Sequence, residues 1–218
     1  MEQENNVVEA SRATISRMPA YLRYLRDERE RGVEYISSSF VAKEMDVSAI
    51  LVRKDFSLVS SNPGKPRLGF EIGHLIHDIE KFLGYDTKTD AVVVGAGGLG
   101  SAFLGYEGFK NYGMNVVAAF DINKKLVGKK IADKPVYDTA TLADFIREKG
   151  IKIGIITVPK AAAQHVCDVM VSAGVKAVWN FAPLLLSVPE GVELKNEDLA
   201  ASLALLSSKL VANGALKE

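Results

Sequence analysis

The chain has 218 residues, a length that suits one large domain or two small ones, and its composition is that of an ordinary globular protein. Its 27 lysines and arginines balance 27 aspartates and glutamates. No overall field therefore draws it to nucleic acid or to a membrane, and any such partner must meet a local patch. The single cysteine excludes an internal disulfide and a multi-cysteine metal site.

The first nine residues are polar and acidic, without the apolar core of a signal peptide, and no apolar run is long enough to span a membrane. One cysteine in a chain of this size also suits a reducing compartment. We expect a cytoplasmic protein that makes no membrane contact.

Residues 1–84 are expected to form a small helical domain. Residues 10–26 carry four arginines and no acid. Ser37 and Ser38 can cap a short helix, and after a turn Ser48 can cap a second one, in which residues 49, 52, 56 and 59 are apolar at helical spacing. Two short helices joined by such a turn predict a helix-turn-helix, and the turn-rich residues 60–67 predict a wing.

Cations gather on this domain, with eleven lysines and arginines against seven acids between residues 10 and 67. A few such residues can neutralise phosphates and supply non-specific DNA affinity. The charge count alone is equally compatible with a solvated surface on a small interaction domain.

Residues 85–195 are expected to form a dinucleotide-binding domain. Residues 91–94 predict a buried strand, and Gly95, Gly97 and Gly100 follow it with the G-x-G-x-x-G spacing that admits a pyrophosphate. We predict that the loop formed by Gly95, Ala96, Gly97, Gly98, Leu99 and Gly100 binds the cofactor at a helix N-terminus.

Asp121 ends the next predicted strand, residues 116–120, and comes twenty-one residues after Gly100. An acid at this place can hydrogen-bond an adenosine ribose, which favours NAD over NADP. Lys124 and Lys125 follow closely, so NADP is disfavoured and not excluded.

Strands and helices then alternate to about residue 192, which predicts a parallel sheet with right-handed crossovers. Further strands are expected at residues 135–137, 154–157 and 177–180, and helices at 100–112, 141–149 and 161–173. The strand ends place two more segments at the carboxyl edge, where ligands of such folds bind. These candidate cofactor contacts are Thr157, Val158 and Pro159, and Asn180, Phe181, Ala182 and Pro183.

Four other reactive side chains, one cysteine and three histidines, have ordinary interpretations. Cys167 lies in an alanine- and valine-rich helical stretch, as an inert core thiol would, and His165 in the same stretch suits a surface or hydrogen-bonded helix position. His74 and His77 share a spacing of three on a predicted helix without a third ligand, so we expect no metal site.

Residues 196–218 are expected to form a C-terminal helix. Asn196 can cap it, and Leu199, Leu203, Leu206 and Leu210 make an apolar seam as far as about residue 212. Such a seam packs either on its own sheet or on a partner subunit. The spacing of the seam suits a dimer interface.

Taken together, the chain resembles the Rex family of redox-sensing transcriptional repressors over nearly its whole length. Matching segments occur in every predicted part. They are residues 14–25, residues 36–38 with Val41 and Ala42, and residues 52–57, followed by the glycine loop, residues 119–121, 157–159, 180–183 and 197–199.

The resemblance implies a winged helix followed by a Rossmann-type parallel sheet, in a homodimer whose C-terminal helix is exchanged between subunits. It implies binding to double-stranded operator DNA when NADH/NAD⁺ is low and release when NADH binds, without catalytic activity. DNA-facing residues would include Arg12, Arg17, Ser48, Arg53, Lys54, Lys65 and Arg67. Tyr106 and Asp198 look like the pair whose contact responds to redox state.

Two departures from the family pattern stand out. The aromatic, glycine-rich wing of the family is replaced by residues 57–63 of different composition, and the third variable position of the glycine loop is Gly98. Two alternatives stay open: an NAD-dependent dehydrogenase, which would need a proton donor beside the nicotinamide, and a CoA- or nucleotide-binding module without DNA contact.

Overall fold

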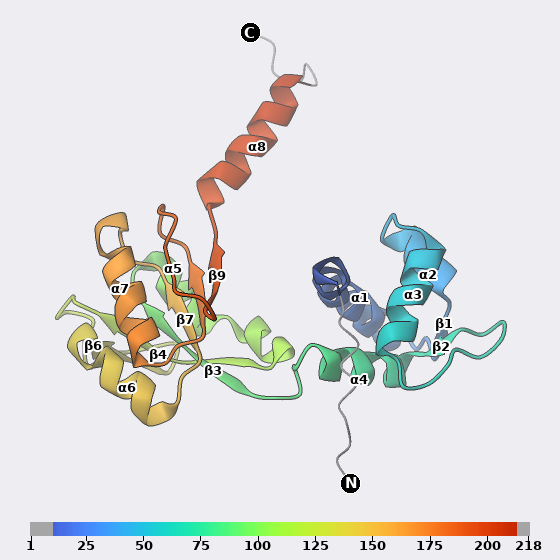
Figure 1. Cartoon of the computed structure of the whole chain (residues 1–218), viewed down its shortest axis with the longest axis horizontal. Helices are drawn as coiled ribbons and strands as arrows, with labels where there is room; N and C mark the ends of the chain where they lie inside the picture. The colour runs from blue at the N-terminus through green and yellow to red at the C-terminus, as the bar shows by residue number, and fades with distance from the viewer. Residues whose placement is uncertain (1–10, 213–218) are drawn as a thin grey trace. The chain divides into compact units, whose positions relative to one another are not determined.

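The computed structural model describes residues 11–212, except for the side chain of Arg12, and divides the chain into two compact units between Thr87 and Lys88. None of its described helices is long and apolar enough to cross a membrane. Each unit has its own hydrophobic core. The helices and strands of both units are labelled in Figure 1.

The first unit is a winged helix. Its elements are α1 (Arg12–Glu30), β1 (Tyr35–Ile36), α2 (Ser38–Glu44), α3 (Ala49–Val59), β2 (Phe70–Glu71) and α4 (Ile72–Phe82). Strands β1 and β2 pair antiparallel, and residues 60–69 form the wing between α3 and β2. The prediction of a helix-turn-helix is confirmed.

Capping serines fix the start of both helices in this motif. The Ser37 hydroxyl accepts a hydrogen bond from the Phe40 amide at 3.2 Å, and the Ser48 hydroxyl accepts one from the Leu51 amide at 3.2 Å. Val52 and Phe56 then pack into a core with Tyr21 of α1 and Phe70 of β2. Because one face of α3 is buried, the opposite face is presented to solvent with a defined orientation.

The second unit is a Rossmann-type sheet of seven strands in the order β5-β6-β4-β3-β7-β8-β9, parallel except for β5. The predicted parallel sheet is confirmed. The strands are β3 (Thr89–Val94), β4 (Met114–Asp121), β5 (Lys130–Ile131), β6 (Lys134–Asp138), β7 (Ile153–Ile156), β8 (Ala177–Asn180) and β9 (Glu193–Asn196).

The connecting helices cover both faces of this sheet. They are α5 (Gly98–Gly105), the 3-10 helices η1 (Glu107–Tyr112) and η2 (Thr139–Thr141), α6 (Leu142–Lys149) and α7 (Lys160–Ala173). Alternate residues of β3 serve the two cores: Val92 and Val94 pack with α6 and α7, whereas Val93 packs with α5 and η1. Cys167 of α7 is fully buried in the first of these cores, and burial raises the pKa of its thiol.

Two predicted elements differ in the structure. The expected helix over residues 100–112 is broken, because Tyr106 adopts an extended backbone that separates α5 from η1. Asn196 does not cap the last helix: it ends β9, and its side-chain oxygen accepts a hydrogen bond from Asn180 at 2.9 Å. The cap is Asp198, whose carboxylate accepts the Ala201 amide at 2.8 Å.

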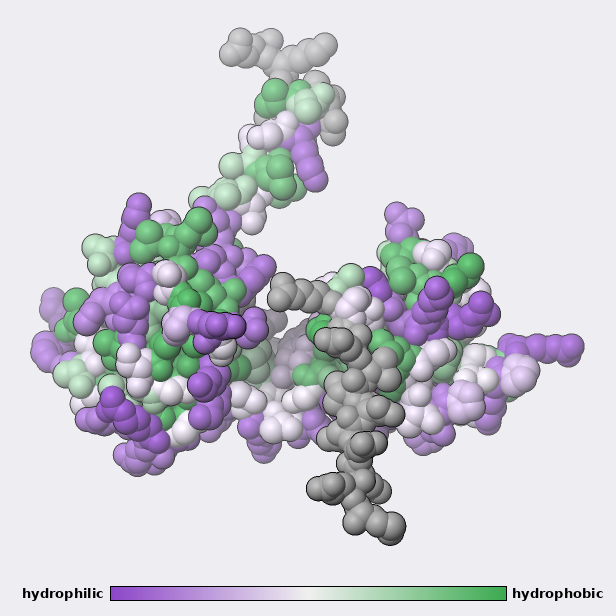
Figure 2. All heavy atoms as spheres, in the orientation of Figure 1, coloured by the Kyte–Doolittle hydropathy of each residue, from purple (hydrophilic) through white to green (hydrophobic). Residues whose placement is uncertain are grey.

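The last helix, α8 (Leu199–Ala212), follows that cap, and Gly214, expected beyond its end, lies outside the described residues. Every side chain of α8 is exposed, and Figure 2 shows apolar residues along its surface. Such a helix lacks the tertiary packing that usually supplies most helical stability.

Candidate functional site

The glycine loop between β3 and α5 needs glycine at two positions for steric reasons. Gly95 has a φ of +100°, and a Cβ built there would lie 2.8 Å from the carbonyl of Thr157. A Cβ at Gly100 would lie 1.8 Å from the Gly95 oxygen. These glycines therefore let α5 approach the strand end closely.

The outer part of the same loop is open. A Cβ at Gly97 or Gly98 would meet nothing within 4 Å, and no side chain caps the N-terminus of α5. The space and the free amides at this helix end are what a bound pyrophosphate requires.

Asp121 is held at the end of β4 by two backbone amides. Its Oδ2 accepts the Ala96 N–H at 2.7 Å, and its Oδ1 accepts the Asn123 N–H at 2.8 Å. The carboxylate therefore ties the glycine loop to the neighbouring strand end. Lys124, one of the two lysines that follow this strand end, forms an ion pair with Asp138.

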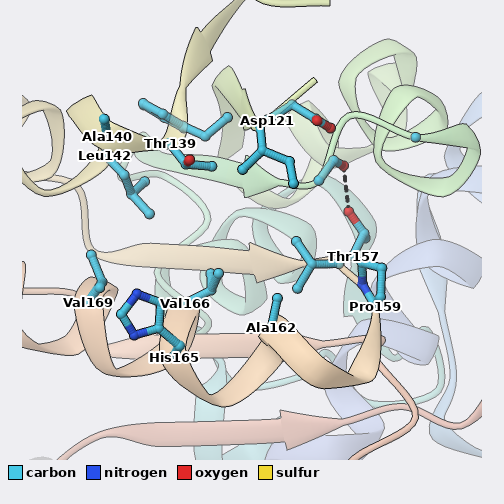
Figure 3. Close-up of a pocket in the computed structure, with 15 residues that line it drawn as sticks. Asp121, Thr139, Ala140, Leu142, Thr157, Pro159, Ala162, His165, Val166 and Val169 are labelled. Atoms are coloured by element: carbon cyan, nitrogen blue, oxygen red, sulfur yellow. Dashed lines mark hydrogen bonds between the residues drawn. The ribbon is translucent and has the colours of Figure 1, made fainter. Parts of the chain in front are cut away.

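A cavity of about 660 Å³ opens beside this carboxylate (Figure 3). Six predicted cofactor residues line it, namely Gly95, Gly97, Asp121, Thr157, Val158 and Pro159. The Thr157 hydroxyl donates to the Gly95 carbonyl at 2.7 Å and so joins two walls. The volume of the cavity lies within the range of small-molecule and cofactor sites.

The far side of the cavity was not predicted from the sequence. It is formed by Ile122, Thr139, Ala140, Leu142, Ala162, His165, Val166 and Val169. Figure 3 shows His165, Val166 and Val169 along one side of α7, with Leu142 across from them. Ile122 is 78% exposed although it is apolar, which suits a residue that covers a bound ring.

The other predicted cofactor segment lies outside that cavity. Asn180 is fully buried and braces the following loop: its Nδ2 donates to the Leu184 carbonyl at 2.7 Å, and its Oδ1 accepts the Ala182 N–H at 2.9 Å. Phe181 packs among aromatic rings, and Pro183 is exposed.

Tyr106 and Asp198 are not joined by a hydrogen bond within the described part of this chain. Tyr106 is 58% exposed and packs edge-on against Phe109, with ring centroids 4.9 Å apart. Asp198 is exposed and caps α8. A contact between them stays a prediction.

The cations of the winged helix fall into two groups. A hollow of about 520 Å³ brings together Arg53 of α3 and Lys65 and Arg67 of the wing. Lys54, which follows Arg53 in the sequence, is exposed on α3 outside the lining of this hollow, and Ser48 caps that helix. Three predicted DNA-facing cations therefore share one concave surface.

Arg17, unlike the cations of the hollow, is bound to a buried carboxylate of its own domain. Its Nε donates to Asp55 Oδ2 at 2.7 Å and its Nη2 to Asp55 Oδ1 at 2.8 Å, while the Tyr21 hydroxyl donates to the same carboxylate at 3.0 Å. Asp55 is only 3% exposed, so this bidentate pair locks α3 onto α1. The Arg12 side chain lies outside the described part of the structure.

Contacts of the side chain and the backbone of Lys65 hold the base of the wing. The Lys65 ammonium donates to the Tyr35 hydroxyl at 2.7 Å, and Lys65 also pairs with Gly69 in an isolated antiparallel bridge. Gly69 has a φ of +90°, and a Cβ there would lie 2.1 Å from the Ile36 oxygen. Arg67 adopts a φ of 67°, which is uncommon for a residue other than glycine.

The His74 side chain has a carboxylate partner. His74 Nδ1 lies 2.5 Å from the carboxylate of Glu71, the residue that caps the start of α4. Within residues 11–212, no three histidine, cysteine or acidic side chains are grouped so that they could hold a metal ion.

Comparison with known families matches both units. A family described as the putative DNA-binding protein N-terminus matches residues 9–57, and the CoA binding domain family matches residues 86–184.

Curated relatives match nearly the whole chain. "Redox-sensing transcriptional repressor Rex" of Treponema denticola is 39% identical over 88% of this chain and 91% of that protein. The protein of the same name from Streptomyces coelicolor is 40% identical over 89% of this chain and 75% of its own length.

Solved structures agree with these relatives. A crystal structure of RSP in complex with β-NAD⁺ and operator DNA superimposes with a TM-score of 0.88 at 38% identity, covering 94% of both chains. A structure of RSP with β-NADH has a TM-score of 0.84 at 38% identity, covering 95% of this chain and 97% of that one.

Proposed function

The chain belongs to the Rex family of redox-sensing transcriptional repressors, and from this premise we propose how its two units carry out that function. The first unit binds operator DNA when NADH/NAD⁺ is low, and NADH bound to the second unit releases it. The observation that carries the proposal is the presence, in one chain, of a cofactor-sized cavity at the glycine loop and a cationic hollow at α3.

NAD(H) is the cofactor that fits the second unit. The Asp121 carboxylate, which also holds the Ala96 amide, receives the ribose hydroxyls, and the amides of Gly98, Leu99 and Gly100 receive the pyrophosphate. The cavity between α6 and α7 receives the adenine. The nicotinamide then lies toward Pro159, Phe181, Ala182 and Pro183.

Operator DNA is met by α3 and the wing. Arg53 and Lys54 lie on the solvent side of a helix whose other face is buried, which suits insertion into a major groove. Lys65 and Arg67 reach the backbone or the adjacent minor groove from the wing. Since Arg17 is bound to Asp55, we give it the role of holding α3 in place.

Two copies are needed to read a two-fold operator. The exposed apolar seam of α8 supports a homodimer in which this helix packs on the partner subunit, where Asp198 comes close to the partner's cofactor and to Tyr106. The nicotinamide ring is cationic in NAD⁺ and neutral in NADH, so a nearby carboxylate favours the oxidised form. The NAD⁺-bound and the NADH-bound dimer would hold the winged helices of the two subunits at different separations.

Neither open alternative explains both units. A dehydrogenase would use a proton donor near the nicotinamide, whereas His165 lines the cavity that we assign to the adenosine half. We assign the chain no catalytic role. The match to the CoA binding domain family makes CoA the second candidate ligand of this unit. A titration with CoA beside NADH and NADPH tests it directly.

The decisive experiment is a mobility-shift titration on a palindromic operator. The protein should bind in NAD⁺ and be released by NADH, and the double variant Arg53→Ala/Lys54→Ala should bind at least about tenfold more weakly because each base-reading contact is worth about 1–3 kcal/mol. Lys176→Ala, which removes an exposed cation from the second unit, is the matched control. Unchanged affinity of the double variant at physiological salt would exclude α3 as the reading helix.

A further inference from the structure

The strand that leads to the predicted nicotinamide segment also carries the only tryptophan of the sequence. Trp179 stacks on Phe103 of α5 with ring centroids 5.5 Å apart and 20° between the ring planes. It also meets Phe181 edge-on at 4.6 Å and Phe109 of η1 at 6.1 Å. The indole therefore contacts three parts of the second unit. They are α5, which follows the glycine loop, η1, which follows Tyr106, and Phe181 of the predicted nicotinamide segment.

The polar edge of the same indole is directed to another element. Trp179 Nε1–H donates a hydrogen bond of 3.2 Å to Oε1 of Glu197. That carboxylate is 31% exposed and also has the Lys195 ammonium 3.7 Å away. A hydrogen bond to an ionised acceptor is stronger than one between neutral groups.

Glu197 occupies the junction between the sheet and α8. Its backbone N–H donates to the Asn180 carbonyl at 2.8 Å, which extends the pairing of β8 and β9 by one step. The next residue, Asp198, caps α8. The side chain and the backbone of Glu197 are therefore both fastened to β8, immediately before the helix begins.

From this arrangement we propose that Trp179 is a positioning residue: through its hydrogen bond to Glu197 it couples the nicotinamide end of the cofactor site to the direction in which α8 leaves the sheet. A shift of Phe181 or Phe103 against a bound ring moves the indole, and the indole moves or releases Glu197. The inference rests on the proposed function, since it assigns the connection between cofactor and dimer helix to one side-chain pair.

Three variants separate the hydrogen bond from packing. Trp179→Phe keeps an aromatic ring in the cluster and removes the N–H, Glu197→Ala removes the acceptor, and Glu197→Gln keeps an acceptor oxygen and serves as the matched control. Each is compared with the unchanged full-length protein for NADH affinity in free solution and for the factor by which NADH weakens operator binding.

We expect Trp179→Phe and Glu197→Ala to bind NADH within about twofold of the unchanged protein. The factor by which NADH weakens operator binding, roughly 5–150-fold for couplings of this kind, should fall by about fivefold, the equivalent of one net hydrogen bond. Glu197→Gln should keep it. Tryptophan emission should shift on addition of NAD⁺ in the unchanged protein and shift less in Glu197→Ala.

Several outcomes would overturn the inference. They are an unchanged coupling factor in Trp179→Phe and Glu197→Ala, a Glu197→Gln variant that behaves like Glu197→Ala, or a loss of NADH affinity that accounts for the whole effect. If Trp179→Phe does not fold, the two variants of the partly exposed Glu197 decide between the outcomes. If the unchanged protein's operator affinity is indifferent to NADH, the proposed function itself fails.

Discussion

At the scale of single residues, the carboxylate of Asp55 shows how a buried charge can organise a binding surface. It lies on the inner face of α3 and receives three hydrogen bonds, two from Arg17 and one from Tyr21. Removing one partner of a buried ion pair leaves the other charge uncompensated, which is strongly destabilising. The solvent-facing Arg53 and Lys54 therefore depend for their orientation on residues that need not touch DNA.

This network gives the winged helix a specific pH dependence. Burial, followed by the hydrogen bond to Asp55, raises the pKa of Tyr21 to about 12 from its usual 10.0. The neutral phenol is thus favoured in the folded state, so its contribution to stability is complete below pH 10 and is lost as the pH rises toward 12. The slope is at most about 1.4 kcal/mol per pH unit for one proton.

Urea unfolding at about pH 9 and about pH 11 measures this slope. Tyr21→Phe should be less stable at the lower pH, by about 1 kcal/mol for the lost hydrogen bond. It should lose less stability than the unchanged protein between the two pH values. Parallel losses in both proteins would mean that Tyr21 does not titrate between them.

Asp121 should set the choice of cofactor. A 2′-phosphate would meet its carboxylate at close range, so NADH should bind more tightly than NADPH, by about tenfold or more. Asp121→Ala removes that repulsion together with the acceptor for the Ala96 amide, and should erode the preference. Asp121→Asn, which keeps an acceptor oxygen, separates the two effects in the same fluorescence titration. Equal affinities of the unchanged protein for both cofactors would refute the assignment.

At the scale of elements, the last helix is the part of the chain with an exposed apolar seam and no described packing to explain it. Leu203 and Leu206 lie on this seam and are 69% and 58% exposed. Burying a leucine side chain is worth about 1.5–3 kcal/mol, and a pair of seams from two subunits would bury several. This stabilising free energy is gained only when α8 packs against a partner subunit.

Charges on the seam should therefore produce monomers. Leu203→Glu/Leu206→Glu, and a chain that ends at Lys195, should sediment as monomers and bind a two-half-site operator much more weakly, since two linked contacts raise avidity by about 10²–10⁴. Ser208→Glu places a charge on the opposite side of α8 and should keep the dimer. A truncated chain that sediments as a dimer would assign the seam to packing within the subunit.

Much of this architecture follows from local sequence rules. Serine caps and apolar spacing predict α2 and α3, and the glycine spacing with Asp121 predicts the turn between β3 and α5. The resemblance to the Rex family is likewise confirmed by the relatives. These features depend on residues near one another in the chain, which is why the sequence displays them.

Features that depend on tertiary pairing were missed. Strand β9 reads E-L-K-N and is a strand only because β8 lies beside it, so the prediction that Asn196 caps a helix is wrong. The far wall of the cofactor cavity comes from segments that carry no motif: Ile122 follows the end of β4, and His165 lies midway along α7. Ligands bind at the carboxyl edge of such a sheet. Applied to the end of β6, this rule could have predicted that Thr139 and Ala140 line the cofactor site.

At the scale of the whole molecule, cofactor and operator must influence each other equally. If NADH weakens operator binding by some factor, saturating operator weakens NADH binding by the same factor, which is expected to be roughly 5–150-fold. Isothermal titration of NADH with and without operator measures it. Tyr106→Phe and Asp198→Ala should each reduce the factor, because they remove the groups proposed to differ between the two arrangements. Equal NADH affinities in both titrations would leave DNA binding and cofactor binding as independent properties of one chain.

The burial of Cys167 has a consequence for what kind of stress such a regulator can perceive. Peroxide sensors work through exposed thiolates of low pKa, whereas this thiol is fully buried with its pKa raised, and it is the only cysteine of the sequence. Hydrogen peroxide and disulfide stress therefore have no thiol target on the folded protein. This repressor is therefore built to respond to the oxidation state of its nicotinamide cofactor and not to the oxidation of its own cysteine.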